Sequence, residues 1–128
     1  MTVPDFRTVS VEELARRVCA RELTAAAVTD AALARIDEVN PVLNAFVAIN
    51  ADDARAQAAA IDARIDAGED VGPLAGIPIG VKDLEDAAGF RTTRGAMHLA
   101  DSTMVDTDST EVARLRAAGC VVIGKTNT

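Results

Sequence analysis

Hydrophobic positions in the first half of the chain recur with the period of an α-helix. The first such face is made by Val11, Leu14, Ala15, Val18 and Cys19. Ser10 and Glu13 have the spacing of a capping box, so a helix is expected to begin just after Ser10. This periodicity continues to about residue 68, and it indicates a helical scaffold.

Two further helices are predicted in this half. Thr24 is expected to cap the second helix, whose apolar stripe consists of Val28, Ala32, Ile36 and Val39. Asn40-Pro41 is expected to end it, because the residue before a proline disfavours the α conformation. Residues 44–49 are expected to form a short strand or a connector. A third helix is expected from about Asp52 to near Gly68, with an apolar face at Ala54, Ala58, Ile61 and Ile65.

The pattern changes near Gly72, where glycine and proline begin to separate short apolar runs. Residues 77–81 and 120–123 are almost continuously apolar, which is typical of strands covered on both faces. Pro78 is expected at a strand start or a sheet edge, because it donates no ladder hydrogen bond.

Between these two strands the sequence predicts a long loop and a helix. Asp108 and Glu111 have capping-box spacing, with Asp108 as the expected N-cap, and Gly119 is expected to end the helix. The order strand, loop, helix, strand indicates an α/β fold.

Composition narrows the possible functions. A chain of 128 residues fits one domain, and we expect no domain boundary within 1–128. The net charge of −7 argues against nucleic acid and against anionic membrane as direct partners. The chain has no Trp or Tyr, so it offers no stacking platform for single-stranded nucleic acid.

Targeting signals are not apparent in the sequence. No secretory signal is recognised at the N-terminus, and no apolar run is long enough for a membrane span. Cys19 and Cys120 are interpreted as small buried hydrophobic residues without a disulfide. The expected location is the cytoplasm.

One apparent motif is rejected on structural grounds. Residues 119–126 match the phosphate-binding pattern G-x-x-x-x-G-K-[ST]. That site needs a flexible loop between a strand and a following helix. Here the intervening residues are β-branched strand formers that follow a helix, so nucleotide binding is not expected.

Metal and serine-histidine chemistry are also not expected. His98 is the only histidine, and the acids lack the glycine and closing glutamate of a calcium loop (Asp101, Asp106 and Asp108). Two serines near His98 could be imagined in a triad (Ser102 and Ser109), but they lie on one loop without a nucleophile elbow. We therefore expect no metal site and no serine-histidine triad.

Lys82 is the residue that points to chemistry. It follows the apolar run 77–81, where partial desolvation would favour its neutral form and allow it to act as a general base. Gly80 leaves room for a backbone or a ligand to approach. The alternative from the residues alone is a structural lysine paired with Asp83 or Glu85.

Three blocks of sequence together resemble the amidase signature family. They are GPLAGIPIGVKD (72–83), GFRTTRG (89–95) and RAAGCVVIGKTN (116–127). The resemblance implies a mixed β-sheet with helices on both faces. It also implies a Ser–cis-Ser–Lys triad in which Lys82 is the catalytic lysine and no cofactor takes part.

The implied reaction is hydrolysis of a linear carboxylic amide through an acyl-enzyme. The family's two serines lie in a Gly/Ser-rich stretch downstream of residue 127, and no such stretch occurs here. We therefore expect this chain to be the N-terminal part of a single amidase domain, helical over 8–68 and α/β over 72–127. We expect it to be inactive alone and marginally stable, because unpaired strand edges favour association.

Two alternatives stay open beside the amidase. The first is the amidase-like subunit of a glutamine-dependent tRNA amidotransferase, which shares these blocks. The second is a short non-catalytic remnant or interaction module. For the full-length enzyme the expected partners are a small-molecule or peptidyl amide substrate, with a homo-oligomer possible.

Overall fold

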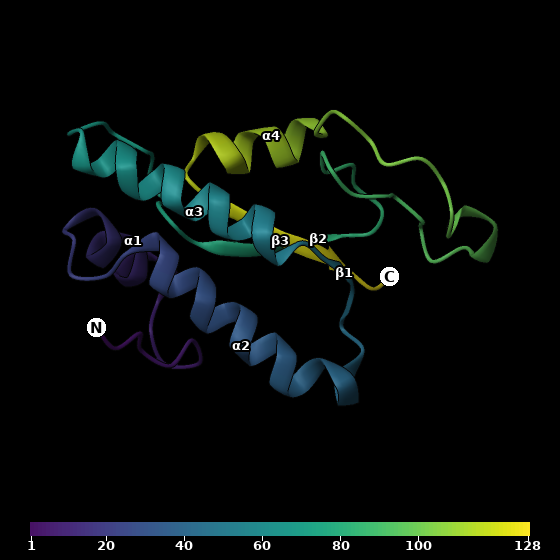
Figure 1. The fold of residues 1–128 in the computed structure, drawn as a ribbon, viewed down its shortest axis with the longest axis horizontal. Coiled ribbons are helices and arrows are strands. Elements are labelled where there is room, and N and C mark those ends of the chain that lie inside the picture. The colour runs from purple at the N-terminus through teal and green to yellow at the C-terminus, as the bar shows by residue number, and fades with distance from the viewer.

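The structure is a computed structural model that describes all residues from 1 to 128. Its elements, in chain order, are α1 (Val11–Cys19), α2 (Ala25–Leu43), β1 (Phe46–Ile49), α3 (Ala51–Asp66), β2 (Pro78–Lys82), the 3-10 helix η1 (Met97–Leu99), α4 (Thr110–Ala117) and β3 (Val121–Thr126) (Figure 1). The strands form one sheet in the order β1-β3-β2. β3 runs antiparallel to β1 and parallel to β2, so the expected mixed α/β fold is confirmed.

The predicted helix starts in the first half are confirmed by their caps. The Ser10 hydroxyl accepts a hydrogen bond from the backbone N–H of Glu13 at 3.1 Å. The Thr24 hydroxyl accepts one from the N–H of Ala27 at 3.0 Å. These bonds satisfy donors that the first turn of a helix leaves free.

The predicted end of α2 is wrong. The helix continues through Pro41 to Leu43, and Asn44 ends it in the left-handed conformation with φ of 50°. The Asn40 side chain accepts from the N–H of Phe46 at 2.8 Å and donates to its carbonyl at 3.1 Å. These bonds tie the last helical turn to β1 and offset the unfavourable conformation before a proline.

The predicted N-cap of α4 is wrong by one residue. Ser109 caps the helix, with its hydroxyl accepting from the N–H of Val112. The Asp108 carboxylate instead accepts from the N–H of Ala88 at 2.8 Å and lies 2.9 Å from Nε of Arg116. The carboxylate is therefore occupied by a loop N–H and a guanidinium and does not cap the helix.

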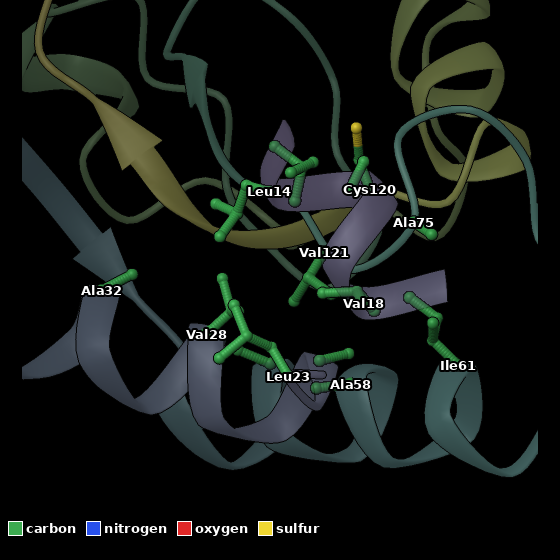
Figure 2. Packing of buried hydrophobic residues seen from close by; sticks show 14 of the residues in the cluster. Leu14, Val18, Leu23, Val28, Ala32, Ala58, Ile61, Ala75, Cys120 and Val121 are labelled. Carbon is green, nitrogen blue, oxygen red and sulfur yellow. The ribbon is translucent and has the colours of Figure 1, made fainter. Parts of the chain in front are cut away.

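The two faces of the sheet are covered by different elements. Alternate residues of a strand point to opposite faces. Val121 and Ile123 belong to a cluster of 18 buried apolar residues, most of which come from α1, α2 and α3, and Figure 2 shows Val18 and Val28 directed toward Val121. Val122 belongs to a second cluster of five on the other face, with the remaining members Val81, Ala87, Phe90 and Val112. Helices therefore lie on both faces, and β1 joins the helical half to the α/β half in one sheet.

The two predicted buried strands differ in exposure. β3 is the central strand, and the burial expected over 120–123 is confirmed, although the strand runs from Val121 to Thr126 and its burial extends to Lys125. β2 is an edge strand in which only Val81 is fully buried, so the prediction that it is covered on both faces is wrong for this chain. Pro78 begins this edge strand, which confirms its predicted place.

The two cysteines also differ. Cys120 is buried, and its burial raises the pKa of its thiol to about 11. Cys19 is exposed, so the prediction that it is buried is wrong. Both thiols are free. None of the helices has the length and apolar character needed to span a lipid bilayer.

Candidate functional site

Lys82 is the last residue of β2, and its side chain is exposed. The expectation that the end of an apolar run desolvates this lysine is not met in this chain, because β2 is an edge strand with little cover. The alternative, a structural lysine paired with Asp83 or Glu85, is wrong as well. Lys82 makes no ion pair with Asp83 or Glu85, and the Asp83 carboxylate faces another cation.

Asp83, directly after Lys82, is 2% exposed. Its carboxylate accepts a hydrogen bond from the backbone N–H of Thr93 at 3.0 Å and another from the Thr93 hydroxyl. The third partner is the amine of Lys125, at 3.1 Å from Oδ1. The carboxylate is thus held by the loop after β2 and by β3 at once.

Lys125 is the buried lysine of this protein, with 0% exposure. Besides Asp83, its amine donates to the carbonyl of Arg91 at 3.0 Å and to the hydroxyl of Thr92 at 3.3 Å. A lysine amine has three protons, so these contacts use its full donor capacity. Sequence reasoning missed this role, although a lysine at the end of a buried strand was a visible signal.

The segment that matches the phosphate-binding pattern, residues 119–126, has a structural role in the sheet. Gly124 and Lys125 lie in β3, and the prediction of a strand over 120–123 in place of a loop is confirmed. A Cβ on Gly124 would lie 2.3 Å from the carbonyl oxygen of Ala48 in β1. Glycine at this position therefore permits strand pairing.

Electrostatics favour the ionised form of Asp83. Burial of its carboxyl raises the pKa, but the hydrogen bonds from Thr93 and Lys125 outweigh that effect. The net result is that the pKa of Asp83 lies below its usual value of 3.8. The pair is therefore a carboxylate and an ammonium held in contact inside the protein.

A cavity of about 400 Å³ lies beside the ion pair. Asp83 and Lys125 contribute to its wall, together with Val47–Asn50 at the end of β1 and Phe90 in the loop. Lys82 does not line it. The ion pair and the exposed lysine thus face different surroundings, although Asp83 and Lys82 are neighbours in sequence.

Gly80, expected to allow a close approach, is approached by side chains. A Cβ at this position would lie 2.7 Å from a methyl carbon of Thr126 and 3.0 Å from the ring of Phe46. The position therefore packs β2 against its neighbouring elements.

The remaining candidates do not form a site with Lys82. His98 lies on η1 and is exposed, Ser109 caps α4, and the Ser102 hydroxyl is buried without a hydrogen-bond partner. Asp108 takes part in the Arg116 ion pair. The structure contains no group of three or more His, Cys, Asp or Glu side chains that could hold a metal ion.

The arrangement is a mixed α/β layer with one exposed lysine at a strand end and one buried lysine on the neighbouring strand. The sequence profile of the amidase family matches residues 27–128, and the chain belongs to this family. The resemblance stated from the three sequence blocks is therefore confirmed.

Curated relatives of the chain include proteins named as a subunit of a tRNA amidotransferase. It is 45% identical over 115 residues to the A subunit of glutamyl-tRNA(Gln) amidotransferase from Acidothermus cellulolyticus, covering 90% of this chain and 23% of that protein. It is 52% identical over 106 residues to the protein of the same name from Roseiflexus sp., covering 83% of this chain and 21% of that protein. The chain thus spans about a quarter of the length of these relatives.

Solved structures include amidases of other kinds. The peptide amidase from Stenotrophomonas maltophilia is 39% identical with a TM-score of 0.86, over 95% of this chain and 25% of that one. A bacterial aryl acylamidase of the amidase signature family is 31% identical with a TM-score of 0.86, over 94% of this chain and 25% of that one. The fold is therefore that of a part of an amidase signature enzyme.

Proposed function

We propose that this chain is the N-terminal part of an enzyme that hydrolyses a linear carboxylic amide, with Lys82 as a catalytic base. In this reaction Lys82 accepts a proton from one serine, and that serine accepts the proton of a second, nucleophilic serine. The nucleophile's oxygen bonds to the carbonyl carbon, the C–N bond breaks, and ammonia or an amine leaves with the proton that Lys82 returns through the first serine. Water then hydrolyses the acyl-enzyme. Both serines come from chain beyond residue 128.

The observation that carries the proposal is that the two lysine side chains differ in their partners and in their exposure. The Lys125 amine is committed to three partners, whereas the Lys82 side chain is exposed and unpaired at the end of an edge strand. Removing an amine from water favours its neutral, basic form. To act as a base, Lys82 must therefore be covered by a further part of the protein. The unpaired edge of β2 leaves space for such a segment to pack.

Replacement of Lys82 in the full-length enzyme tests this proposal. Using release of 4-nitroaniline from an acyl 4-nitroanilide, we expect Lys82→Ala to lower kcat/KM by about 100- to 10,000-fold, because the base is lost. The matched control is Arg35→Ala, which removes an exposed cation of α2 paired with Glu38. Near-normal activity of Lys82→Ala would refute the proposed role.

The second candidate is the amidase-like subunit of a glutamine-dependent tRNA amidotransferase. The two curated relatives named above favour it, because both carry this name and their identity to the chain is 45% and 52%. The test is purification of the full-length protein from its source. Co-purifying partner chains with glutamine hydrolysis would support this candidate, whereas amide hydrolysis by the isolated protein would support the amidase.

A cytoplasmic location is also proposed. The two free thiols support a reducing compartment, where cysteines stay unpaired. Cell fractionation with detection by an antibody against residues 10–68 tests it, and recovery only outside the cytoplasmic fraction would contradict it.

A further inference from the structure

We propose that the buried Asp83–Lys125 ion pair is a positioning element that sets the direction in which Lys82 leaves the sheet. The inference rests on the proposed role of Lys82 as the catalytic base. Neither Asp83 nor Lys125 touches the reacting atoms in this proposal. They act through the backbone that carries Lys82.

Asp83 is fixed at both its backbone and its side chain. Its N–H donates to the carbonyl of Thr126 at 2.9 Å, and its own carbonyl accepts from the N–H of Arg94 at 2.9 Å. Its carboxylate is held by Thr93 and Lys125. A residue held at these points has little freedom to rotate about its own backbone.

Lys125 ties three segments together at one point. It belongs to β3, it pairs with the residue after β2, and it donates to the carbonyl of Arg91 in the following loop. The Thr92 hydroxyl that accepts from Lys125 donates in turn to Asp86 at 2.7 Å. Movement of any one segment would therefore break contacts in the other two.

The direction of Lys82 follows from that of Asp83. Successive side chains of a strand point to opposite sides, and Lys82, the last residue of β2, is exposed between the buried residues Val81 and Asp83, the first residue of the following turn. Asp83 is directed into the protein and is 2% exposed, whereas Lys82 is directed outward and its side chain is exposed. Lys82 is also paired in register with Thr126, next to Lys125 on β3. The orientation of the amine is thus set by its sequence neighbour.

An ion pair suits this purpose better than apolar packing does. Buried ion pairs add little stability compared with well-packed hydrophobic residues of the same volume, because both charges lose their hydration. A buried ion pair instead restricts the two side chains to one geometry, because displacement of either side chain leaves a buried charge unpaired. A catalytic base needs this kind of definition, because small misplacements of a reacting group cost rate.

The experiment removes both charges together in the full-length enzyme, as Asp83→Asn/Lys125→Met. We expect kcat for the acyl 4-nitroanilide to fall by about 10- to 100-fold with KM nearly unchanged, because the base is misplaced while substrate contacts remain. The acidic limb of the kcat/KM pH profile should also move, since the surroundings of Lys82 change. Val112→Ala is the control, because it removes packing from the same small cluster without touching the ion pair.

The outcomes separate this inference from the proposed function. Unchanged kcat in a folded double variant would overturn the positioning role, and so would an equal loss of kcat in Val112→Ala. If the double variant does not fold, Thr93→Val decides, because it removes one hydrogen bond to Asp83 and keeps both charges. A lower kcat with unchanged KM supports the role, and an unchanged kcat overturns it. Full activity of Lys82→Ala would instead refute the proposed function, and the inference with it.

Discussion

One face of the sheet is packed by α1, α2 and α3, which share with the sheet a cluster of 18 buried apolar residues. The other face has only five such residues, and the buried pair Asp83 and Lys125 lies on that side with Thr92 and Thr93. The first face is held by hydrophobic burial, which tolerates small shifts. The second face is held in part by hydrogen bonds and an ion pair, which are directional and weaken when the groups shift. Lys82 emerges next to the second kind of structure.

The largest expected effect comes from leaving one charge of the buried pair without its partner. Lys125→Met should lower the free energy of unfolding by about 4 kcal/mol, because the Asp83 carboxylate remains buried without its counter-ion. Urea denaturation followed by circular dichroism measures this change. The double variant Asp83→Asn/Lys125→Met should be more stable than Lys125→Met alone, and the opposite order would contradict the pairing.

A core truncation on the other face should have a somewhat smaller effect. Leu23 is 1% exposed and belongs to the large cluster. Leu23→Ala should cost about 3 kcal/mol, because it removes buried apolar surface and leaves a cavity. The same denaturation measures it, with exposed Leu43→Ala as the control. Equal costs for Leu23 and Leu43 would contradict the described packing.

The link between α3 and β3 should contribute less. The Gln57 side chain accepts from the N–H of Val122 at 3.0 Å and donates to its carbonyl at 3.1 Å, as a neighbouring strand would. It also accepts from Arg116 at 2.8 Å. Gln57→Ala should cost about 2 kcal/mol, because the backbone groups of Val122 lose their side-chain partner.

Hydrogen exchange gives an independent reading of this link. The amide of Val122 should exchange faster in Gln57→Ala than in the wild type, whereas the amide of Ala54 in α3 should not. Unchanged protection of Val122 would show that its N–H does not depend on Gln57.

A smaller cost is expected at the edge of the helical face. Ser10→Ala should lower stability by about 1 kcal/mol, because the N–H of Glu13 loses the hydroxyl that accepts from it. Thermal unfolding measures this effect. Ser10→Asp should retain most of the stability, since a carboxylate also caps a helix, and a loss as large as that of Ser10→Ala would argue against capping.

The smallest effect is a pH dependence that belongs to the second face alone. Because the pKa of Asp83 is lower in the folded chain than its usual 3.8, the ionised pair contributes stability above that value. This contribution is lost as the pH falls through the folded pKa, because protonation removes the charge. Unfolding curves measured between neutral and acidic pH should therefore differ in slope between the wild type and Asp83→Asn/Lys125→Met, and parallel slopes would contradict the assignment.

The sequence predicted the helical face better than the site face. Residues such as Leu14, Val28 and Ala58 are buried as their periodicity indicated, because that signal is local. The partner of Asp83 lies far along the chain on β3, and pairing at that distance leaves no local pattern. A register shift between Ile79 and Gly80 also alters which residues of β2 and β3 face each other. From the residues alone, Lys82 was either a general base or a structural lysine, and the family resemblance favoured the catalytic role. Its exposure here follows from the edge position of β2.

The most direct test of the contrast between the two lysines is their chemical reactivity, because Lys82 and Lys125 are the only lysines in the chain. The folded chain of residues 1–128, in which Lys82 is exposed, would be treated with a succinimidyl ester, and modification of each lysine would be followed by peptide mass mapping. We expect rapid modification of Lys82 and protection of Lys125 until the protein is unfolded in urea. Modification of Lys125 at the same rate as Lys82 in the native protein would contradict the buried ion pair.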